Sequence, residues 1–231
     1  MLNWDSTFFG YEVGRLDISS IKNFDIFKFK EESKKYRLIY VYSNEKLKMN
    51  SDFKLVDEKV TYFQKIDANN LAANAIQNFP ICSFKREHAD INQLRQLALE
   101  SGIYSRFNVD TNFTNNEYQR LYLEWIENSV NGNLAYEILI ACKEKRIAGF
   151  TTIGKKSPEL ADIGLVAVDN ACRGKGIGFN LINETIKRAK EKSFEFIQVV
   201  TQRNNTPACK LYEKTNFKVK EIINIYHYWN Q

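Results

Sequence analysis

An arginine and three glycines lie close together directly before an apolar, helix-like segment. Residues 172–182 read CRGKGIGFNLI, with glycines at 174, 176 and 178. Glycines at this spacing let a backbone come very near to another group, because no side chains intervene. The run separates a strand-like segment, 161–169, from a helix-like segment, 178–192. The free N–H groups of a first helical turn point outward at the positive end of the helix dipole, which favours an anion such as a pyrophosphate.

Two other glycine motifs do not fit this run. The phosphate loop of nucleotide hydrolases requires GxxxxGK followed by serine or threonine, which the chain lacks. The dinucleotide fingerprint requires a glycine three positions after Gly176, where Phe179 stands. A purely structural strand-to-helix turn stays open as an alternative. We favour a pyrophosphate-binding loop of the form Arg-x-x-Gly-x-Gly, from Arg173 to Gly178.

The segments around this loop predict an α/β protein with two parts. Apolar periodicity and turn residues predict strands at 11–18, 36–43 and 53–66, a helix at 19–35 and a connection at 67–80. They then predict helices at 88–102 and 114–132, a hairpin within 136–156, a strand at 161–169, a helix at 178–192, a strand at 194–202, a helix at 205–215 and a strand at 217–229. We therefore expect a smaller α/β N-terminal lobe, 1–79, followed by a domain with a mixed central sheet, 80–231.

The two parts also share an internal similarity. Residues 52–63 and 216–228 have phenylalanine, lysine, an apolar residue, an acid and a late tyrosine in register. The N-terminal lobe would then be a truncated copy of the C-terminal half. A chance match of two amphipathic strands explains the similarity equally well.

Composition limits the classes of function. The chain has 231 residues, 44% of them hydrophobic, and a formal net charge of +5, which is typical of a soluble globular protein and is weak evidence for nucleic-acid binding. The first ten residues include Asp5 and no long apolar run, so we expect them not to form a signal peptide, and no stretch approaches a run of about 20 apolar residues. Four scattered cysteines and two histidines form no zinc set. We expect a cytoplasmic protein with free thiols, no metal, no membrane contact and no nucleic-acid partner.

Two motifs in the second half resemble a known superfamily. The segment VAVDNACRGKGIGFNLI looks like the acetyl-CoA pyrophosphate loop of the GCN5-related N-acetyltransferases, or GNAT enzymes. Downstream, NNTPACKLYEKTNF resembles their second signature, Asn-x-x-Ala-x-x-x-Tyr. This resemblance covers about the last 90 residues and implies the GNAT acyl-CoA N-acyltransferase fold, with acetyl-CoA as the acetyl donor.

The resemblance assigns residues to the acetyl donor. The strand before the loop would pair its backbone with the pantetheine arm, and the neighbouring strand, 196–201, would splay away to admit the thioester. Tyr212 would donate a proton to the thiolate of CoA, since a phenol stays protonated at neutral pH. A core tyrosine and, for Asn205, a plain helix cap are the structural alternatives. The donor-binding residues implied are Leu165, Val166, Ala167, Val168, Arg173, Gly174, Lys175, Gly176, Ile177, Gly178, Asn205 and Ala208.

A narrower resemblance covers nearly the whole chain. LNWDSTFFG, residues 105–134 and VVTQRNNTPACKLY are similar to acetyltransferases of dTDP-fucosamine, which acetylate the 4-amine of dTDP-4-amino-4,6-dideoxygalactose. This implies a nucleotide-linked amino-deoxysugar as the acceptor, attacking directly in a ternary complex without an acyl-enzyme. Tyr104, Arg106 and Phe107 would bind that substrate, Arg106 through the diphosphate and Phe107 by stacking. An arginine that ties the loop to a carboxylate is the alternative.

Several points stay open. No general base is evident: His88 has the character of a surface residue, and Glu137 would have to act through a water. Cys172 and Cys209 are interpreted as packing residues. Alternative acceptors are a peptide N-terminus, a lysine or a polyamine, and a non-catalytic acyl-CoA-binding module is a further alternative. An exposed sheet edge could support a homodimer. Asn216 replaces the glycine that usually precedes the last strand, and asparagine tolerates the left-handed conformation needed there.

Overall fold

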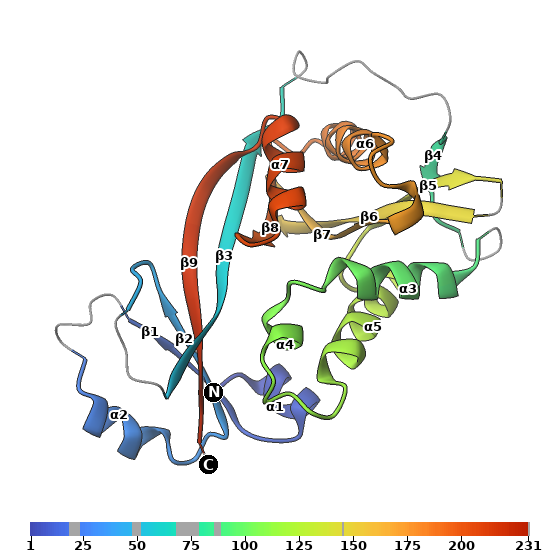
Figure 1. Cartoon of the computed structure of the whole chain (residues 1–231). Helices are drawn as coiled ribbons and strands as arrows, with labels where there is room; N and C mark the ends of the chain where they lie inside the picture. The colour runs from blue at the N-terminus through green and yellow to red at the C-terminus, as the bar shows by residue number, and fades with distance from the viewer. Residues whose placement is uncertain (19–23, 48–51, 68–78, 86–88, 145, 231) are drawn as a thin grey trace. The chain divides into compact units, whose positions relative to one another are not determined.

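A computed structural model describes residues 1–18, 24–47, 52–67, 79–85, 89–144 and 146–230 (Figure 1). The predicted connection at 67–80 and the start of the predicted helix at 19–35 lie largely outside these residues. The chain forms two compact units. The first unit comprises residues 1–60, 202–204 and 221–231, and the second comprises 61–201 and 205–220. The sequence boundary after residue 79 stays a prediction. The last strand contributes residues to both units.

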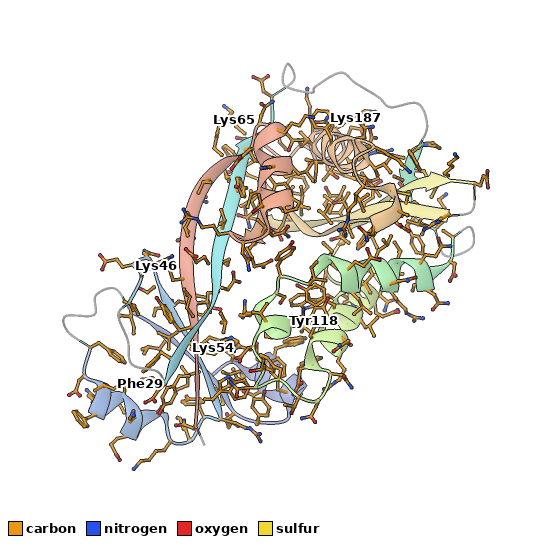
Figure 2. All side chains as sticks on the ribbon, in the orientation of Figure 1. Phe29, Lys46, Lys54, Lys65, Tyr118 and Lys187 are labelled. Carbon is orange, nitrogen blue, oxygen red and sulfur yellow. The ribbon has the colours of Figure 1, made fainter. Side chains whose placement is uncertain are left out.

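The first unit has the strand order β1-β2-β9-β3. Its elements are α1 (Asn3–Phe9), β1 (Val13–Asp17), α2 (Ile26–Ser33), β2 (Leu38–Ser43), much of β3 (Phe53–Lys65) and most of β9 (Lys218–Trp229). Strand β1 is parallel to β2, and β2 is antiparallel to β9. The core of this unit joins α2 to one face of these strands. Phe29 of α2 packs edge-on against Tyr228 of β9, with ring centroids 4.9 Å apart (Figure 2).

The second unit has a mixed sheet in the order β3-β8-β7-β6-β5-β4. Its strands after β3 are β4 (Ile81–Ser83), β5 (Glu137–Lys143), β6 (Arg146–Ser157), β7 (Leu160–Val168) and β8 (Phe196–Gln202). Strands β4 to β7 pair antiparallel in sequence order, and β7 pairs parallel with β8. The helices are α3 (Ile91–Ser101), α4 (Arg106–Val109), α5 (Glu117–Val130), α6 (Ile177–Glu191) and α7 (Thr206–Lys214), with a short 3-10 turn at Asn170–Cys172.

Helices cover both faces of the sheet in the second unit. Helices α6 and α7 lie on one face, and α3, α4 and α5 lie on the other (Figure 1). Helix α6 buries Ile177, Leu181 and Ile186 at helical spacing against the strands, which its amphipathic sequence requires. The core between them includes Leu139, Ala148 and Ile153. The order of elements predicted after residue 80 is confirmed. The sequence did not indicate α1, α4 or the short strand β4.

Candidate active site

The glycine loop connects β7 to α6 and adopts the conformation that its glycines permit. Gly174 and Gly176 have φ angles of 76° and 77°, a left-handed backbone that disfavours side chains. Arg173 folds back and donates a hydrogen bond from Nε to the carbonyl of Val168, at 3.1 Å. The first intrahelical bond at this end runs from Asn180 N to Gly176 O, so the N–H groups before Asn180 have no acceptor within the helix. These N–H groups can donate hydrogen bonds to an anion.

Gly178 has a different purpose from the other two glycines. A Cβ atom at Gly178 would lie 3.2 Å from Leu211 of α7, whereas a Cβ at Gly174 would meet nothing within 4 Å. The third glycine therefore lets α6 and α7 approach closely. It brings the start of α6 next to the helix that carries Tyr212.

A gap opens between β7 and β8 beside this loop. The two strands pair from Leu160 with Phe196 to Ile163 with Val199, and β7 then continues alone on that side to Val168. Leu165 N bonds to Thr152 Oγ1 and Asp169 N bonds to Ala148 O, both on β6. Since peptide groups alternate along a strand, those of Val166 and Val168 face the gap. The splay expected between these strands is present.

A β-bulge sits at the start of the gap. Gly164 and Leu165 together oppose Thr152, because the register shifts between the pairs Ile163–Ile153 and Val166–Thr151. A Cβ atom on Gly164 would lie 2.9 Å from Thr152 Oγ1, which accepts the Leu165 hydrogen bond. The bulge therefore depends on a glycine at this position.

Tyr212 lies on α7, with its side chain only 4% exposed. Burial, and then the nearby Cys209 thiol, raise the pKa of its phenol above the ordinary value, so the group stays protonated. Asn216 follows the helix with φ of 68°, as its tolerance of this conformation predicts. Phe217 N bonds to Tyr212 O and Asn216 N to Glu213 O, which together form a Schellman motif. This helix ending holds the backbone of Tyr212.

Asn205 caps the same helix. Its side-chain oxygen accepts a hydrogen bond from Ala208 N at 3.3 Å. The cap alternative for Asn205 is thus present in the structure, and a contact with the donor stays a prediction for Asn205 and Ala208. Pro207 in the first turn lacks an N–H that would otherwise need an acceptor.

One carboxylate beside the gap was not among the residues expected from the sequence motifs. Asp162 pairs with Gln198, whose Nε2 donates to Asp162 Oδ1 at 2.7 Å. Burial raises the pKa of Asp162, and the Gln198 hydrogen bond opposes that shift only in part. Asp162 also lies near the end of the β7–β8 pairing. An acid inside an otherwise apolar strand, ADIGLVAV, was the available signal for this residue.

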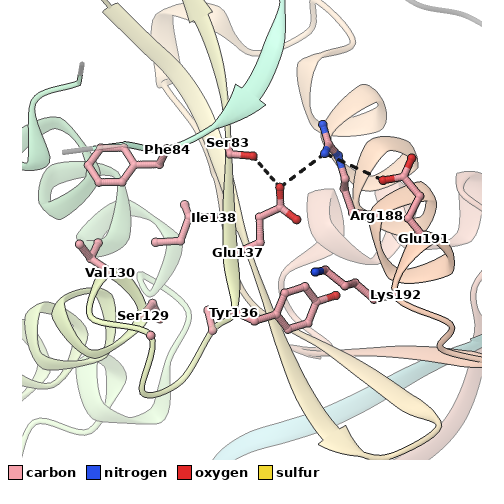
Figure 3. Close-up of a pocket in the computed structure, with 12 residues that line it drawn as sticks. Ser83, Phe84, Ser129, Val130, Tyr136, Glu137, Ile138, Arg188, Glu191 and Lys192 are labelled. Atoms are coloured by element: carbon pink, nitrogen blue, oxygen red, sulfur yellow. Dashed lines mark hydrogen bonds and ion pairs between the residues drawn. The ribbon is translucent and has the colours of Figure 1, made fainter. Parts of the chain in front are cut away.

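Glu137 lies on the other face of the sheet. It pairs with Ile153, which pairs with Ile163, so these three side chains share the α6 face, and Asp162 points the opposite way. Ser83 donates to Glu137 at 2.6 Å, and Arg188 of α6 lies 3.8 Å away, in a pocket of about 580 Å³ (Figure 3). The Glu137 carboxylate is thus held by other residues. His88 lies outside the described residues.

The predicted substrate residues follow α3. Arg173 of the glycine loop lies 3.6 Å from Glu100, near the end of α3, so the segment with Tyr104 that leads from α3 to Arg106 at the start of α4 begins near the glycine loop. The Arg106 guanidinium lies 4.4 Å from the centre of the Phe107 ring. Phe107 itself is buried, 5.5 Å from Phe113. Stacking of Phe107 on a substrate stays a prediction, although the ring packs inside the protein.

The cysteines differ in their surroundings. Cys172 is buried in the core beneath α6, which confirms its packing role. Cys209 is half-buried and lies beside Tyr62 and Tyr212. None of the four cysteines, all of which lie among the described residues, forms a disulfide. The described residues hold no cluster of histidine, cysteine and acidic side chains suited to a metal ion, and none of their helices is long and apolar enough to cross a membrane.

The chain is similar in sequence to known acetyltransferases. The model of the Acetyltransferase (GNAT) family matches residues 91–217, which is more than half of the chain. SpsD, a spore coat polysaccharide biosynthesis protein of Bacillus subtilis, is 27% identical over 143 residues, covering 62% of this chain and 49% of SpsD. The dTDP-fucosamine acetyltransferase of Escherichia coli O6:H1 is 30% identical over 144 residues, covering 62% and 59%. The chain thus matches only about half the length of these curated relatives.

Solved structures show the same fold. A functionally unknown conserved protein from Staphylococcus epidermidis has a TM-score of 0.65 at 14% identity, covering 94% of this chain and 83% of that one. A tandem GNAT protein from the clavulanic acid biosynthesis pathway has a TM-score of 0.58 at 13% identity, covering 87% and 66%. At these identities the likeness concerns the fold alone, and it confirms the predicted mixed α/β fold.

Proposed function

This chain belongs to the acetyltransferase (GNAT) family, and we propose that it transfers an acetyl group from acetyl-CoA to the amine of a nucleotide-linked amino-deoxysugar. The observation that carries the proposal is the gap between β7 and β8 directly beside the glycine loop. The start of α6 could bind the pyrophosphate of acetyl-CoA, and the edge of β7 could pair with its extended pantetheine arm, which carries the thioester.

The donor would lie along residues of one continuous segment. The N–H groups of Gly174 to Gly178 would take the pyrophosphate, with Arg173 and Lys175 supplying positive charge. The backbone of Leu165 to Val168 would pair with the pantetheine arm. The peptide groups of Val166 and Val168 face the gap and are therefore available for this pairing, since those of Leu165 and Asp169 bond to β6.

Two side chains on opposite faces would handle the protons. Asp162, with its raised pKa, would take the proton of the amine, directly or through a water, because an ammonium has no lone pair with which to attack. Tyr212, on the α7 face, would donate to the departing thiolate. The attack needs no covalent intermediate on the protein, and positioning of the two substrates supplies much of the rate.

The acceptor class rests on two named relatives and one loop. The dTDP-fucosamine acetyltransferase and the polysaccharide biosynthesis protein SpsD both match over 62% of the chain. Our best candidate is therefore a dTDP-4-amino-4,6-dideoxyhexose, with Tyr104, Arg106 and Phe107 on its side of the site. Four cysteines without a disulfide fit a reducing compartment, and we propose the cytoplasm as the compartment of this reaction. A homodimer stays a prediction.

A panel of acceptors tests this function. Release of free thiol from acetyl-CoA is measured with dTDP-4-amino-4,6-dideoxygalactose, its gluco epimer and spermidine, each offered separately, for the wild type and Tyr212→Phe. The proposal expects release with a dTDP-sugar, slowed at least tenfold by Tyr212→Phe. Release with spermidine alone would assign a polyamine acceptor. Binding of acetyl-CoA without release for any amine would indicate a non-catalytic module.

A further inference from the structure

A second tyrosine, Tyr62 of β3, lies against the helix that carries Tyr212. The strand order of the second unit places β3 next to β8, and Tyr62 is 2% exposed. Its hydroxyl donates a hydrogen bond to Glu213 Oε1 at 3.0 Å. Its ring centre lies 5.6 Å from that of Tyr212, with the two ring planes at 52°. The Cys209 thiol is a further hydrogen-bonding neighbour of the Tyr62 hydroxyl.

These three contacts lie on one face of α7. Positions 212 and 213 follow position 209 by three and four residues, so both of these side chains adjoin that of Cys209 across a single helical turn. The Tyr62 side chain therefore contacts α7 at Tyr212, which we assign as the acid, and at Cys209 and Glu213 on either side of it in the sequence. Burial first, and then the hydrogen bonds to Cys209 and Glu213, raise the pKa of Tyr62, so its hydroxyl remains a donor over the physiological pH range.

Helix α7 needs such support. It has nine residues, from Thr206 to Lys214, and a helix of this length is only marginally stable without tertiary contacts. Its ends are held by the Asn205 cap and by the turn at Asn216. The direction of the Tyr212 hydroxyl also depends on the rotation of the helix about its axis. The hydrogen bond from Tyr62 to Glu213 restrains this rotation one residue from Tyr212.

We propose that Tyr62 is a positioning residue, which acts through Glu213 and the Tyr212 ring to hold the Tyr212 phenol at the gap between β7 and β8. This inference rests on the proposed function, in which Tyr212 is the proton donor. It gives a role in the reaction to a strand far from both signatures in the sequence. Substrates make no contact with Tyr62 in this proposal.

The test compares the steady-state kinetics of Tyr62→Phe, Glu213→Gln, Tyr212→Phe and the double variant Tyr62→Phe/Tyr212→Phe. Tyr62→Phe keeps the ring and removes the hydrogen bond. We expect kcat to fall about tenfold, with KM for acetyl-CoA within about twofold of wild type, because a residue that acts only in the chemical step changes kcat. Glu213→Gln, which retains an acceptor oxygen, should stay closer to the wild-type kcat.

The double variant separates positioning from general support. If Tyr62 acts through Tyr212, the double variant should be no slower than Tyr212→Phe alone. Tyr226→Phe is the matched control, because Tyr226 is also buried and its hydroxyl accepts a hydrogen bond from Leu47 N in the first unit. Its kcat should equal that of the wild type even where its melting temperature falls as far as that of Tyr62→Phe.

Two results would overturn the inference, and they differ from failure of the proposed function. A Tyr62→Phe variant with wild-type kcat, or rate losses that multiply in the double variant, would show that Tyr62 does not act through Tyr212. If wild type released no thiol with any amine, the proposed function itself would be wrong, and a fully active Tyr212→Phe would exclude Tyr212 as the proton donor.

Discussion

Gln198 donates a hydrogen bond to Asp162 across 2.7 Å, one residue pair before β7 and β8 separate. The contact fixes a carboxylate at the mouth of the gap, on the face of the sheet opposite α6. Tyr212 lies on α7, which covers the face of the same sheet that α6 covers (Figure 1). A thioester in the gap would therefore have a proton acceptor on one side and a proton donor on the other, as amine acetylation requires.

The first prediction concerns Asp162→Asn. As the base, Asp162 must be ionised, so the kcat/KM of the wild type should decrease as the pH drops below the pKa of Asp162, which is raised above the usual range for aspartate. The Asp162→Asn variant, which has no ionisable group here, should lose about 10²-fold or more in kcat/KM. The measurement is the pH profile of kcat/KM for both proteins. A wild-type rate for Asp162→Asn would exclude Asp162 as the base.

The same substitution should stabilise the fold. A pKa raised in the folded state means that the folded protein holds this proton more tightly than the unfolded chain does. The stabilising effect is complete below the unfolded pKa and is lost as pH rises through the folded pKa. At neutral pH the ionised Asp162 therefore opposes folding, and Asp162→Asn should raise the melting temperature. A lower melting temperature at pH 7 would contradict the sign of this shift.

A third prediction concerns the glycine loop. Gly174→Ala introduces a Cβ at φ of 76° in open space, so its cost is backbone strain of about 1–2 kcal/mol. If the loop binds pyrophosphate, KM for acetyl-CoA should rise several-fold. Gly10→Ala is the matched control, with φ of 78° and nothing within 4 Å, and it should lower stability similarly without changing KM. Equal KM values in both variants would argue against pyrophosphate binding at Gly174.

A fourth prediction concerns the end of α7. Asn216→Gly should keep activity and stability, because glycine adopts φ of 68° without strain, whereas Asn216→Val should destabilise by about 1–3 kcal/mol. Asn216→Val should also lower kcat, because the turn at Asn216 holds the backbone of Tyr212. Thermal unfolding and kinetics of both variants check this. A stable, fully active Asn216→Val would show that the turn is dispensable.

The last prediction concerns the acceptor side. Arg106→Gln should raise KM for the dTDP-sugar about tenfold, the effect of losing one charge-assisted hydrogen bond of about 1.5 kcal/mol, and leave KM for acetyl-CoA unchanged. Arg95→Gln is the control, because Arg95 pairs with Glu127 on the adjoining helices. A change in the KM for acetyl-CoA alone would indicate that Arg106 binds the donor and not the dTDP-sugar.

The elements that we propose to hold the donor could be predicted from local sequence. The glycine loop, the strand before it and the helix with Tyr212 each have a signature within a few residues, and Asn216 could be interpreted from its backbone tolerance alone. Asp162 could not, because the bulge at Gly164 and Leu165 shifts the alternation of side chains and hides which face the acid occupies. The contact of Tyr62 with Glu213 joins residues 151 positions apart, which local patterns do not record.

Acetylation of the acceptor itself tests the central claim most directly. The mass of dTDP-4-amino-4,6-dideoxygalactose is measured before and after incubation with acetyl-CoA and the purified protein, with Asp162→Asn and Tyr212→Phe alongside. The account predicts a sugar heavier by one acetyl group on the amine, formed much more slowly by both variants. An unchanged sugar, with thiol released only by hydrolysis or with another amine acetylated instead, would contradict it.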